Sequence, residues 1–413
     1  SDSNANKPGY KKTKLGWIPE DWEIYKLDQL GSFKNGINKS KHAFGKGNPL
    51  VKLMDVFENR EISNYPDGLI ETNTKECKEY SLKQGDILFV RSSVKPSGVG
   101  LTALISDTLD KTTYSGFLIR FRTYKEDISK YFKKYIFQAP YFRVHLLNKS
   151  TISANTNINQ NSLKNLFVAL PPLPEQQKIA QILSTWDQAI EKTEQLIEKK
   201  QLLKKGLMQQ LLSGKVRFPE FNDSWQEVKL GEVFKERNES GYNHLPLLAI
   251  TDQNGVIYRD QVDKRDTSNP DKSKYKRICP GDIGYNTMRL WQGRSALSEL
   301  EGIVSPAYTV VTPKEHVDAL FMSYFFKLPK TIHLFYRYSQ GLVSDTLNCK
   351  YKHFKLVHVK IPPTKKEQAK IGNLLKKQDK EIKQLQNQVE LLKKQKKGLM
   401  QKLLTGRIRV KTD

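Results

Sequence analysis

The strongest constraint on the fold of this chain is an internal repeat. Residues 175–214 and 367–406 align without a gap at a constant offset of 192 residues, and 17 of the 40 paired positions are identical. A proline pair precedes each copy, and a Gly-Leu-Met-Gln stretch lies near the end of each. Unrelated segments do not match over such a length, so the chain consists of two related halves.

Apolar side chains in both repeated segments recur in alternating steps of four and three residues. A mean spacing of 3.5 residues is typical of the seam of a left-handed coiled coil, which predicts two long helices. The economical partner for each seam is the other copy, and the alternative is a helix of another protein. The seam positions are Ile179, Leu183, Trp186, Ile190, Thr193, Ile197, Leu207 and Leu211 in the first copy, and Ile371, Leu375, Gln378, Ile382, Leu385, Val389, Leu392, Lys396, Leu399 and Leu403 in the second.

Residues at the ends of both segments agree with helix boundaries. Pro174 suits the first turn of a helix, and Thr364 with Glu367 has the spacing of a capping box. Gly214 and Gly406 suit a left-handed C-terminal cap.

Glycine also stands inside both predicted helices, at the matching positions 206 and 398. Each interior glycine costs a helix about 1 kcal/mol relative to alanine. A close backbone approach or a bend would explain the repetition, and the alternative is that both are merely tolerated.

The two regions that precede the helices are predicted to be mixed α/β with many short strands. In the first half we predict strands at 85–90, 117–122 and 166–170 and a helix at 127–137. In the second half the parallels are 281–286, 307–311, 317–327 and 356–361. The predicted fold is therefore α+β, with two similar mixed α/β domains at 1–170 and 216–361, followed by spacer helices at 171–215 and 362–413 respectively.

The charge and the cysteine content of the chain indicate which class of partner it binds and in which compartment we expect it. The chain carries 69 Lys and Arg against 44 Asp and Glu, a formal net charge of +25. This excess indicates a polyanionic partner, with nucleic acid first and an anionic membrane surface second, and an inert basic surface as the alternative. Three dispersed cysteines imply no disulfide framework, so a reducing cytoplasm is expected. We expect neither a signal peptide in the polar first residues nor a membrane-spanning helix.

Signatures of catalysis are missing. Gly45-Lys46-Gly47 lacks the rest of a phosphate-binding loop, and the Pro-Pro pairs do not fit the Asn/Asp-Pro-Pro-Tyr/Phe pattern of an amino-methyltransferase. Asp67 and Asp271 each follow a proline, as in metal-dependent nucleases, but no acidic-x-Lys group follows, and we interpret both as turns. The seven histidines lack metal-binding spacing. The sequence predicts neither a catalytic residue nor a metal ligand.

Several motifs together identify a known family. They are Pro-Pro-Leu-Pro-Glu-Gln-Gln-Lys-Ile-Ala at 171–180, its weaker copy at 362–371, the two Gly-Leu-Met-Gln stretches, and a proline followed by tryptophan near the start of each half (Pro19 with Trp22, Pro219 with Trp225). Over its whole length the chain resembles the specificity subunits of type I restriction-modification systems. One departure is an extra residue before the second helix, where Thr364-Lys365-Lys366 replaces Leu173-Pro174.

The resemblance implies a subunit that is not an enzyme. Its two target recognition domains would each read one half of a split DNA site, and its two helices would pair antiparallel. The implied partners are double-stranded DNA, methyltransferase subunits (two of them), and restriction/translocase subunits. No cofactor would be bound by this chain: S-adenosylmethionine would belong to the methyltransferase, and ATP with Mg to the nuclease partner. The alternative is a coiled-coil assembly scaffold with nonspecific DNA affinity.

Candidate DNA-contacting residues follow from the chemistry of base recognition. Arg pairs with guanine and Asn or Gln with adenine through two hydrogen bonds, so polar loops held by strands are the candidates. For each residue the alternative is a solvated loop or turn, and Trp291 beside them is more typical of packing than of base stacking. The candidates are Arg91, Ser92, Ser93, Lys95, Asn155, Asn157, Asn159 and Gln160 in the first half, and Asn286, Thr287, Arg289, Gln292, Arg294, Ser339 and Gln340 in the second.

Overall fold

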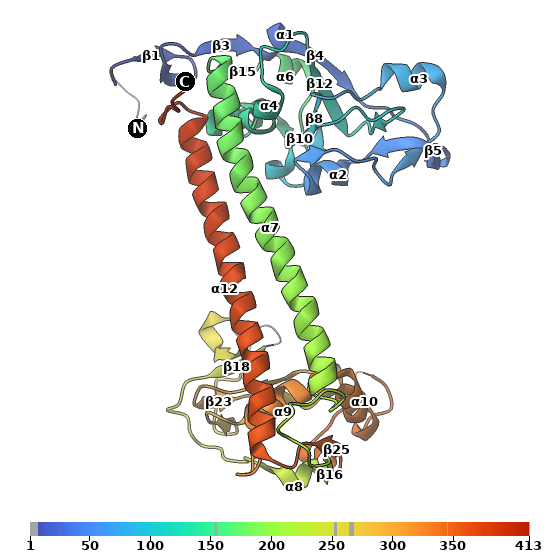
Figure 1. The fold of residues 1–413 in the computed structure, drawn as a ribbon, viewed down its shortest axis with the longest axis vertical. Coiled ribbons are helices and arrows are strands. Elements are labelled where there is room, and N and C mark those ends of the chain that lie inside the picture. The colour runs from blue at the N-terminus through green and yellow to red at the C-terminus, as the bar shows by residue number, and fades with distance from the viewer. Residues whose placement is uncertain (1–6, 153–154, 252–253, 264–267, 345, 413) are drawn as a thin grey trace. The chain divides into compact units, whose positions relative to one another are not determined.

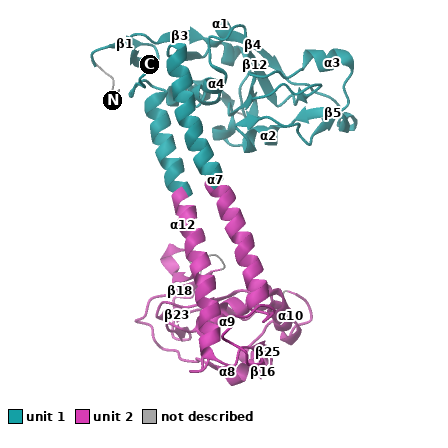
Figure 2. Ribbon diagram, in the orientation of Figure 1, with its two compact units in different colours: residues 1–192, 389–413 teal, residues 193–388 magenta. Residues whose placement is uncertain are grey.

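The structure is a computed structural model that describes residues 7–152, 155–251, 254–263, 268–344 and 346–412. The chain forms two compact units (Figure 2): unit 1 comprises residues 1–192 and 389–413, and unit 2 comprises residues 193–388. Each unit combines a mixed α/β region with a part of both long helices. The units therefore do not coincide with the two halves of the sequence.

The two repeated segments are long helices, as predicted. Helices α7 (Leu173–Leu211) and α12 (Lys365–Leu403) each have 39 residues and begin at positions related by the 192-residue offset (Figure 1). The extra residue of the second copy, Thr364, precedes α12, and its hydroxyl accepts a hydrogen bond from the backbone N–H of Glu367 at 3.4 Å. Gly214 and Gly406 adopt the expected left-handed conformation after the helices.

The predicted close backbone approach at the interior glycines is wrong. A Cβ atom placed on Gly206 or Gly398 would meet no other atom within 4 Å. Both positions are open, so steric crowding does not explain why each helix keeps a glycine.

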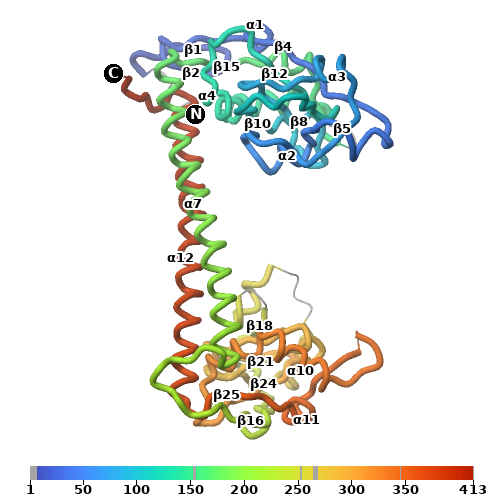
Figure 3. Tube along the Cα trace, turned by 45° about the vertical axis from the view of Figure 1, so that its right-hand side comes forward, coloured from blue at the N-terminus to red at the C-terminus, as the bar shows by residue number. Residues whose placement is uncertain are grey.

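In unit 1 the first turns of α7 pack antiparallel to the last turns of α12 (Figure 3). Asp187 of α7 accepts hydrogen bonds from Lys396 Nζ of α12 and from Tyr135 Oη, the latter at 2.7 Å. Burial by itself would raise the pKa of Asp187, but the hydrogen bonds from Lys396 and Tyr135 outweigh burial and hold this pKa below its ordinary value. The predicted seam position Lys396 is buried, so a charged pair replaces an apolar contact there.

Unit 2 repeats this arrangement with the helix roles exchanged. Asp379 of α12 accepts hydrogen bonds from Lys204 Nζ of α7 and from Tyr324 Oη, the latter at 2.6 Å. Lys200 of α7 also pairs with Glu381 of α12 at 2.8 Å. The antiparallel pairing and the seam are thus confirmed in each unit.

The α/β part of unit 1 is built on a five-stranded sheet of order β4-β12-β8-β10-β6, in which only the β10–β6 pair is parallel. Smaller sheets are β11-β5-β7, β13-β14-β9, β15-β3 and β1-β2. The elements are β1 (Tyr10–Thr13), β2 (Gly16–Pro19), β3 (Glu23–Lys26), α1 (Leu27–Leu30), β4 (Gly31–Asn35), β5 (Phe44–Val51), α2 (Leu53–Glu58), β6 (Glu61–Ile62), β7 (Leu69–Ile70), α3 (Thr74–Glu79), β8 (Ile87–Val90), β9 (Ser92–Ser93), β10 (Thr102–Ile105), β11 (Thr113–Tyr114), β12 (Leu118–Thr123), α4 (Lys130–Ile136), α5 (Pro140–Asn148), β13 (Thr151–Ile152), β14 (Thr156–Asn157), α6 (Gln160–Lys164) and β15 (Phe167–Leu170).

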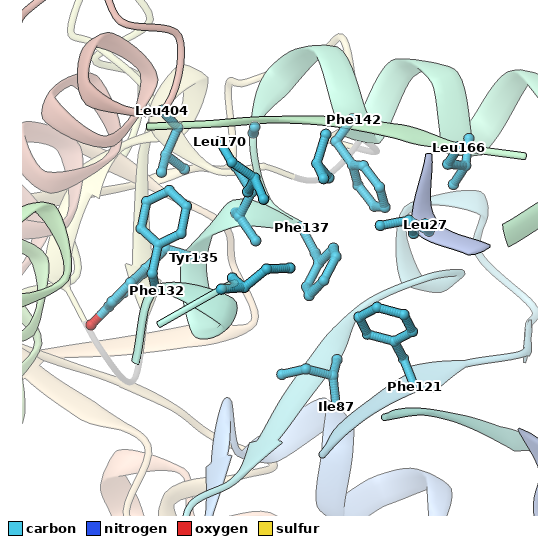
Figure 4. Close-up of a cluster of buried hydrophobic side chains, with 14 of the residues drawn as sticks. Leu27, Ile87, Phe121, Phe132, Tyr135, Phe137, Phe142, Leu166, Leu170 and Leu404 are labelled. Atoms are coloured by element: carbon cyan, nitrogen blue, oxygen red, sulfur yellow. The ribbon is translucent and has the colours of Figure 1, made fainter. Parts of the chain in front are cut away.

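The main core of unit 1 joins this sheet to its helices (Figure 4). Phe121 of β12 packs edge-on to Phe137, which follows α4. Leu404, which follows α12, is fully buried in the same cluster although it comes from the far end of the chain. The end of the second repeated helix is therefore an integral part of the first α/β unit.

Unit 2 contains the corresponding sheet in shorter form, with order β17-β24-β21-β22. The pair β16-β25 corresponds to β3-β15. Two further two-stranded sheets are formed by β18 with β19 and by β20 with β23. The elements are β16 (Gln226–Lys229), α8 (Leu230–Val233), β17 (Phe234–Glu236), β18 (Leu248–Thr251), β19 (Gly255–Tyr258), β20 (Lys276–Ile278), β21 (Ile283–Asn286), β22 (Ser295–Leu297), β23 (Gly302–Val304), β24 (Tyr308–Pro313), α9 (Ala319–Phe325), α10 (Pro329–Tyr338), α11 (Tyr351–Phe354) and β25 (His358–Ile361). Every strand and helix predicted outside the long helices is present, within a few residues.

The sequence Gly-Asp-Ile occurs at 85–87 and at 281–283, and in each unit it forms the turn that leads into the central strand, β8 or β21. Gly85 and Gly281 have φ values of 87° and 90°, which glycine adopts without strain. Asp86 is buried and receives two hydrogen bonds from Arg122, at 2.7 and 2.6 Å. In unit 2 the buried carboxylate is Asp282. It accepts a hydrogen bond from Arg237, which directly follows β17, whereas Arg122 lies in β12. These aspartates therefore hold the sheets together.

Candidate nucleic-acid interface

In unit 1 the two polar segments proposed to face DNA are brought together in one small sheet. Strand β9, just after the central strand β8, pairs antiparallel with β14, with Ser93 opposite Thr156 and Ser92 opposite Asn157. The backbone N–H of Ile158 donates to the carbonyl of Arg91 at 2.9 Å and extends the pairing. The sequence placed these segments more than sixty residues apart, and only the sheet makes them neighbours.

Side chains at this edge divide into exposed and structural ones. Arg91, Lys95 and Asn155 are exposed, and Arg91 Nη1 donates to the Gly116 carbonyl at 3.3 Å. Asn159 caps α6 by accepting from the N–H of Ser162 at 2.8 Å. The Gln160 side-chain amide lies against β4, and the amide orientation that satisfies both of its ends directs its nitrogen to the Phe33 carbonyl at 2.9 Å. The last two side chains thus have local structural roles.

Unit 2 places its two polar segments in the same relation. Thr287 directly follows the central strand β21, and its carbonyl accepts from the N–H of Cys349 at 2.8 Å. Gln340 and Asn348 form an antiparallel bridge just before that contact. Arg91 and Thr287 are each the first residue after the central strand, so the N–H of Cys349 corresponds to that of Ile158. The candidate segments of unit 2 are therefore also joined.

Residues 286–294 form a compact turn at this edge. The side chain of Asn286 accepts from the N–H of Met288 at 3.0 Å, and Trp291 Nε1 donates to the Met288 carbonyl at 2.9 Å. Arg289 is exposed, with Nη1 3.4 Å from Oε1 of Gln292. Trp291 lies edge-on to Tyr336 at 6.2 Å, which supports the packing interpretation of this tryptophan.

The remaining candidates lie close to this turn in the fold. Arg294 and Gln340 are exposed, and the Ser339 hydroxyl donates to the Phe335 carbonyl at 2.7 Å, at the end of α10. Two further residues at these edges were not predicted from the sequence. Asn348 precedes Cys349 in unit 2 just as Asn157 precedes Ile158 in unit 1. Phe117 is exposed, and its carbonyl accepts from the N–H of Arg91. Asparagine was among the residue types sought, but only the two equivalent backbone links show where Asn348 lies.

Among the described residues of the two edges, groups suited to acid–base, nucleophilic or metal chemistry do not gather. Burial raises the pKa of the Cys349 thiol to about 12, so this thiol is protonated at neutral pH. Across the described residues, no three His, Cys, Asp or Glu side chains are grouped so that they could hold a metal ion. The side chains at both edges instead suit hydrogen bonding and phosphate contact.

Comparison with known proteins decides the family. Residues 19–200 and 222–393 both match the type I restriction modification DNA specificity domain. The chain belongs to this family. It is 30% identical to the putative type I restriction enzyme MjaX specificity subunit of Methanocaldococcus jannaschii, over 98% of this chain and 97% of that protein. It is 27% identical to the EcoKI specificity subunit of Escherichia coli over 36% of this chain and 32% of that one.

Solved structures of specificity subunits have the same fold. The type I restriction-modification S subunit from M. genitalium aligns with a TM-score of 0.55 at 15% identity, covering 92% of this chain and 96% of that one. A chain from a study of complex assembly and conformational transition in the type I R-M system aligns with a TM-score of 0.55 at 16% identity, covering 95% and 99%. In the described part of this specificity-domain chain, no helix is both long and apolar enough to span a membrane.

Proposed function

We propose that this chain is the DNA-recognition subunit of a type I restriction-modification complex and that each unit reads one half of a split target. The observation that carries the proposal is the repeated junction at the end of the central strand. In unit 1 it joins Arg91 to Ile158, and in unit 2 it joins Thr287 to Cys349. Each junction gathers two polar segments whose residue types differ between the units, which suits two readers of different base sequences.

The division of labour between side chains follows from their chemistry. Arg91 and Arg289 are exposed at the two junctions and have the paired donors that match the O6 and N7 atoms of guanine. Asn155, Asn157 and Asn286 have the amide geometry suited to adenine. Lys95 and Arg294 suit phosphate contacts, which position the protein but carry no sequence information.

The chain would act in a complex, without chemistry of its own. We propose that it docks methyltransferase subunits, two in number, and restriction/translocase subunits. S-adenosylmethionine would be bound by the methyltransferase, and ATP with Mg by the translocase. The specificity chain would bind no cofactor and act in the cytoplasm. Its family and the motifs missing from its sequence support this assignment.

The decisive experiment is selection of bound sequences from a random duplex library at two salt concentrations. The complex used is this chain with its methyltransferase partner. We expect a split motif with a fixed unread gap that persists at the higher salt. Binding without a motif that vanishes as salt rises would mean phosphate attraction only, and would favour an assembly scaffold with nonspecific DNA affinity.

A further inference from the structure

The two units differ in the hairpin that leads into the junction. In unit 1, β13 and β14 pair Ile152 with Thr156, so three residues separate this pair in the sequence. In unit 2 the bridge joins Gln340 to Asn348, so seven residues separate that pair in the sequence. The hairpin of unit 2, residues 340–348, is therefore the longer of the two in sequence.

The tip of this longer hairpin is apolar and open to solvent. Leu342 is fully exposed and Val343 is 60% exposed. Leaving two branched apolar side chains in water is unfavourable, and burying one fully is worth about 1.5–3 kcal/mol. An apolar side chain beside the polar recognition edge is stabilised when a ligand bound at that edge covers it.

Hydrogen bonds link the described residues of this hairpin to one another. Gln340 and Asn348 exchange two backbone hydrogen bonds of 2.8 Å. The Thr346 hydroxyl accepts from the N–H of Val343 at 3.2 Å, and the N–H of Thr346 donates to the Val343 carbonyl at 2.9 Å. Residues that are already held by such hydrogen bonds lose less conformational entropy when they make a contact.

The surroundings of the hairpin indicate which partner covers it. The hairpin is continuous with the candidate DNA edge through the Cys349–Thr287 hydrogen bond. Arg337 precedes it and Lys350 follows it in the chain, and both are exposed. Cations on both sides of an apolar tip complement a polyanion that has apolar groups between its charges. In the major groove of DNA those groups are the C5 methyls of thymine.

We propose that Leu342 is a specificity-determining residue that contacts the C5 methyl of a thymine in the half-site read by unit 2. The inference rests on the proposed function, because it assumes that unit 2 reads bases. It assigns apolar readout to the hairpin of unit 2.

The test removes the methyl from the DNA and the side chain from the protein in turn. Duplexes of the selected sequence carry deoxyuridine in place of each thymine of the unit 2 half-site, one at a time. Binding is measured for the full chain with its methyltransferase partner, as wild type and as Leu342→Ala. Replacement of residues 20–165 by a relative's region identifies the unit 2 half-site as the one left unchanged.

We expect one deoxyuridine to weaken wild-type binding about fourfold, the value for a buried methyl-sized group. Leu342→Ala weakens binding to the thymine duplex by a similar factor and no longer distinguishes the two bases. Leu356→Ala, at an exposed leucine between α11 and β25, is the matched control and keeps the discrimination. Unchanged urea midpoints show that both variants remain folded.

Three outcomes overturn the inference: a half-site without thymine, a deoxyuridine effect that persists in Leu342→Ala, or equal weakening on all sequences. In each case the selected motif itself would still support the proposed function. Absence of any motif would instead refute the proposed function.

Discussion

Glu175 forms a two-bonded ion pair with Arg409, a residue 234 positions later in the chain. Both N···O distances are 2.8 Å, and the carboxylate is buried at the start of α7, where it also accepts from Trp22 Nε1 at 3.1 Å. In unit 2 the same 192-residue offset gives Glu367 and Arg217, again with both distances at 2.8 Å. The glutamate at the start of each long helix is thus bound by an arginine that lies beyond the end of the other helix.

Removing either arginine should destabilise its own unit. Arg409→Ala leaves a buried carboxylate that retains only the indole, and we expect a loss of about 2 kcal/mol in the free energy of unfolding. This lies below the usual cost of breaking a fully buried pair because Arg409 is partly exposed. Arg217→Ala is the matched variant in unit 2. Urea unfolding of the full chain measures both, and unchanged midpoints would contradict the proposed role of these pairs.

The buried pair between the helices of unit 1 should make stability depend on pH in acid. Because the pKa of Asp187 is below its ordinary value in the folded chain, its contribution is present above about pH 4 and is lost as pH falls through the folded pKa. Asp187→Asn should lower the urea midpoint at pH 6 but change it less at pH 3. Equal effects at both pH values would show that the charge of Asp187 contributes nothing.

Replacing the glycine inside either long helix by alanine should increase the stability of the chain. Gly206→Ala and Gly398→Ala each place a methyl group in open space, so we expect each to stabilise the chain by about 1 kcal/mol. Gly214→Ala is the control: its φ is +71° and its Cβ would lie 3.2 Å from Trp225, so it should destabilise. Thermal unfolding compares the three. Loss of stability in the first two would indicate that the helices bend there.

Single arginines at the two junctions should control single base pairs. Arg91→Ala and Arg289→Ala should each relax specificity at one base pair of the target. The cost in binding free energy is about 1–3 kcal/mol if the arginine forms two hydrogen bonds to guanine. Each variant is the control for the other, since only its own half-site should change. Selection from a random library measures the effect. A uniform loss across all sequences would instead identify a phosphate contact.

The modular repeat predicts exchangeable specificity. Replacing residues 20–165 by the equivalent region of a related specificity subunit should change one half-site and leave the other intact. The physical reason is that both polar segments of the first junction, at Arg91 and Ile158, lie inside the exchanged region. Selected motifs of parent and chimera are compared. If both half-sites change together, the two units do not read independently.

Much of the fold could be predicted because its signals are local or periodic. The repeat, the 3.5-residue spacing and the proline and glycine boundaries identified both long helices, and the segments predicted at 85–90 and 281–286 contain the central strands β8 and β21. Of the two side chains in the predicted capping box, only the threonine acts as predicted. Thr364 caps as expected, but the Glu367 carboxylate binds Arg217 and Trp225, a contact between residues far apart in the chain.

The sequence alone determined the architecture of this protein, its duplicated plan and its resemblance to specificity subunits, because each of these depends on residues close together or regularly spaced. The tertiary structure alone decided which segments meet. It joined Arg91 to Ile158 and Thr287 to Cys349, gave Asn159 a capping role, and exposed Leu342 at a hairpin tip. Pairing between distant strands depends on the packing of the whole sheet, which local residue patterns do not record.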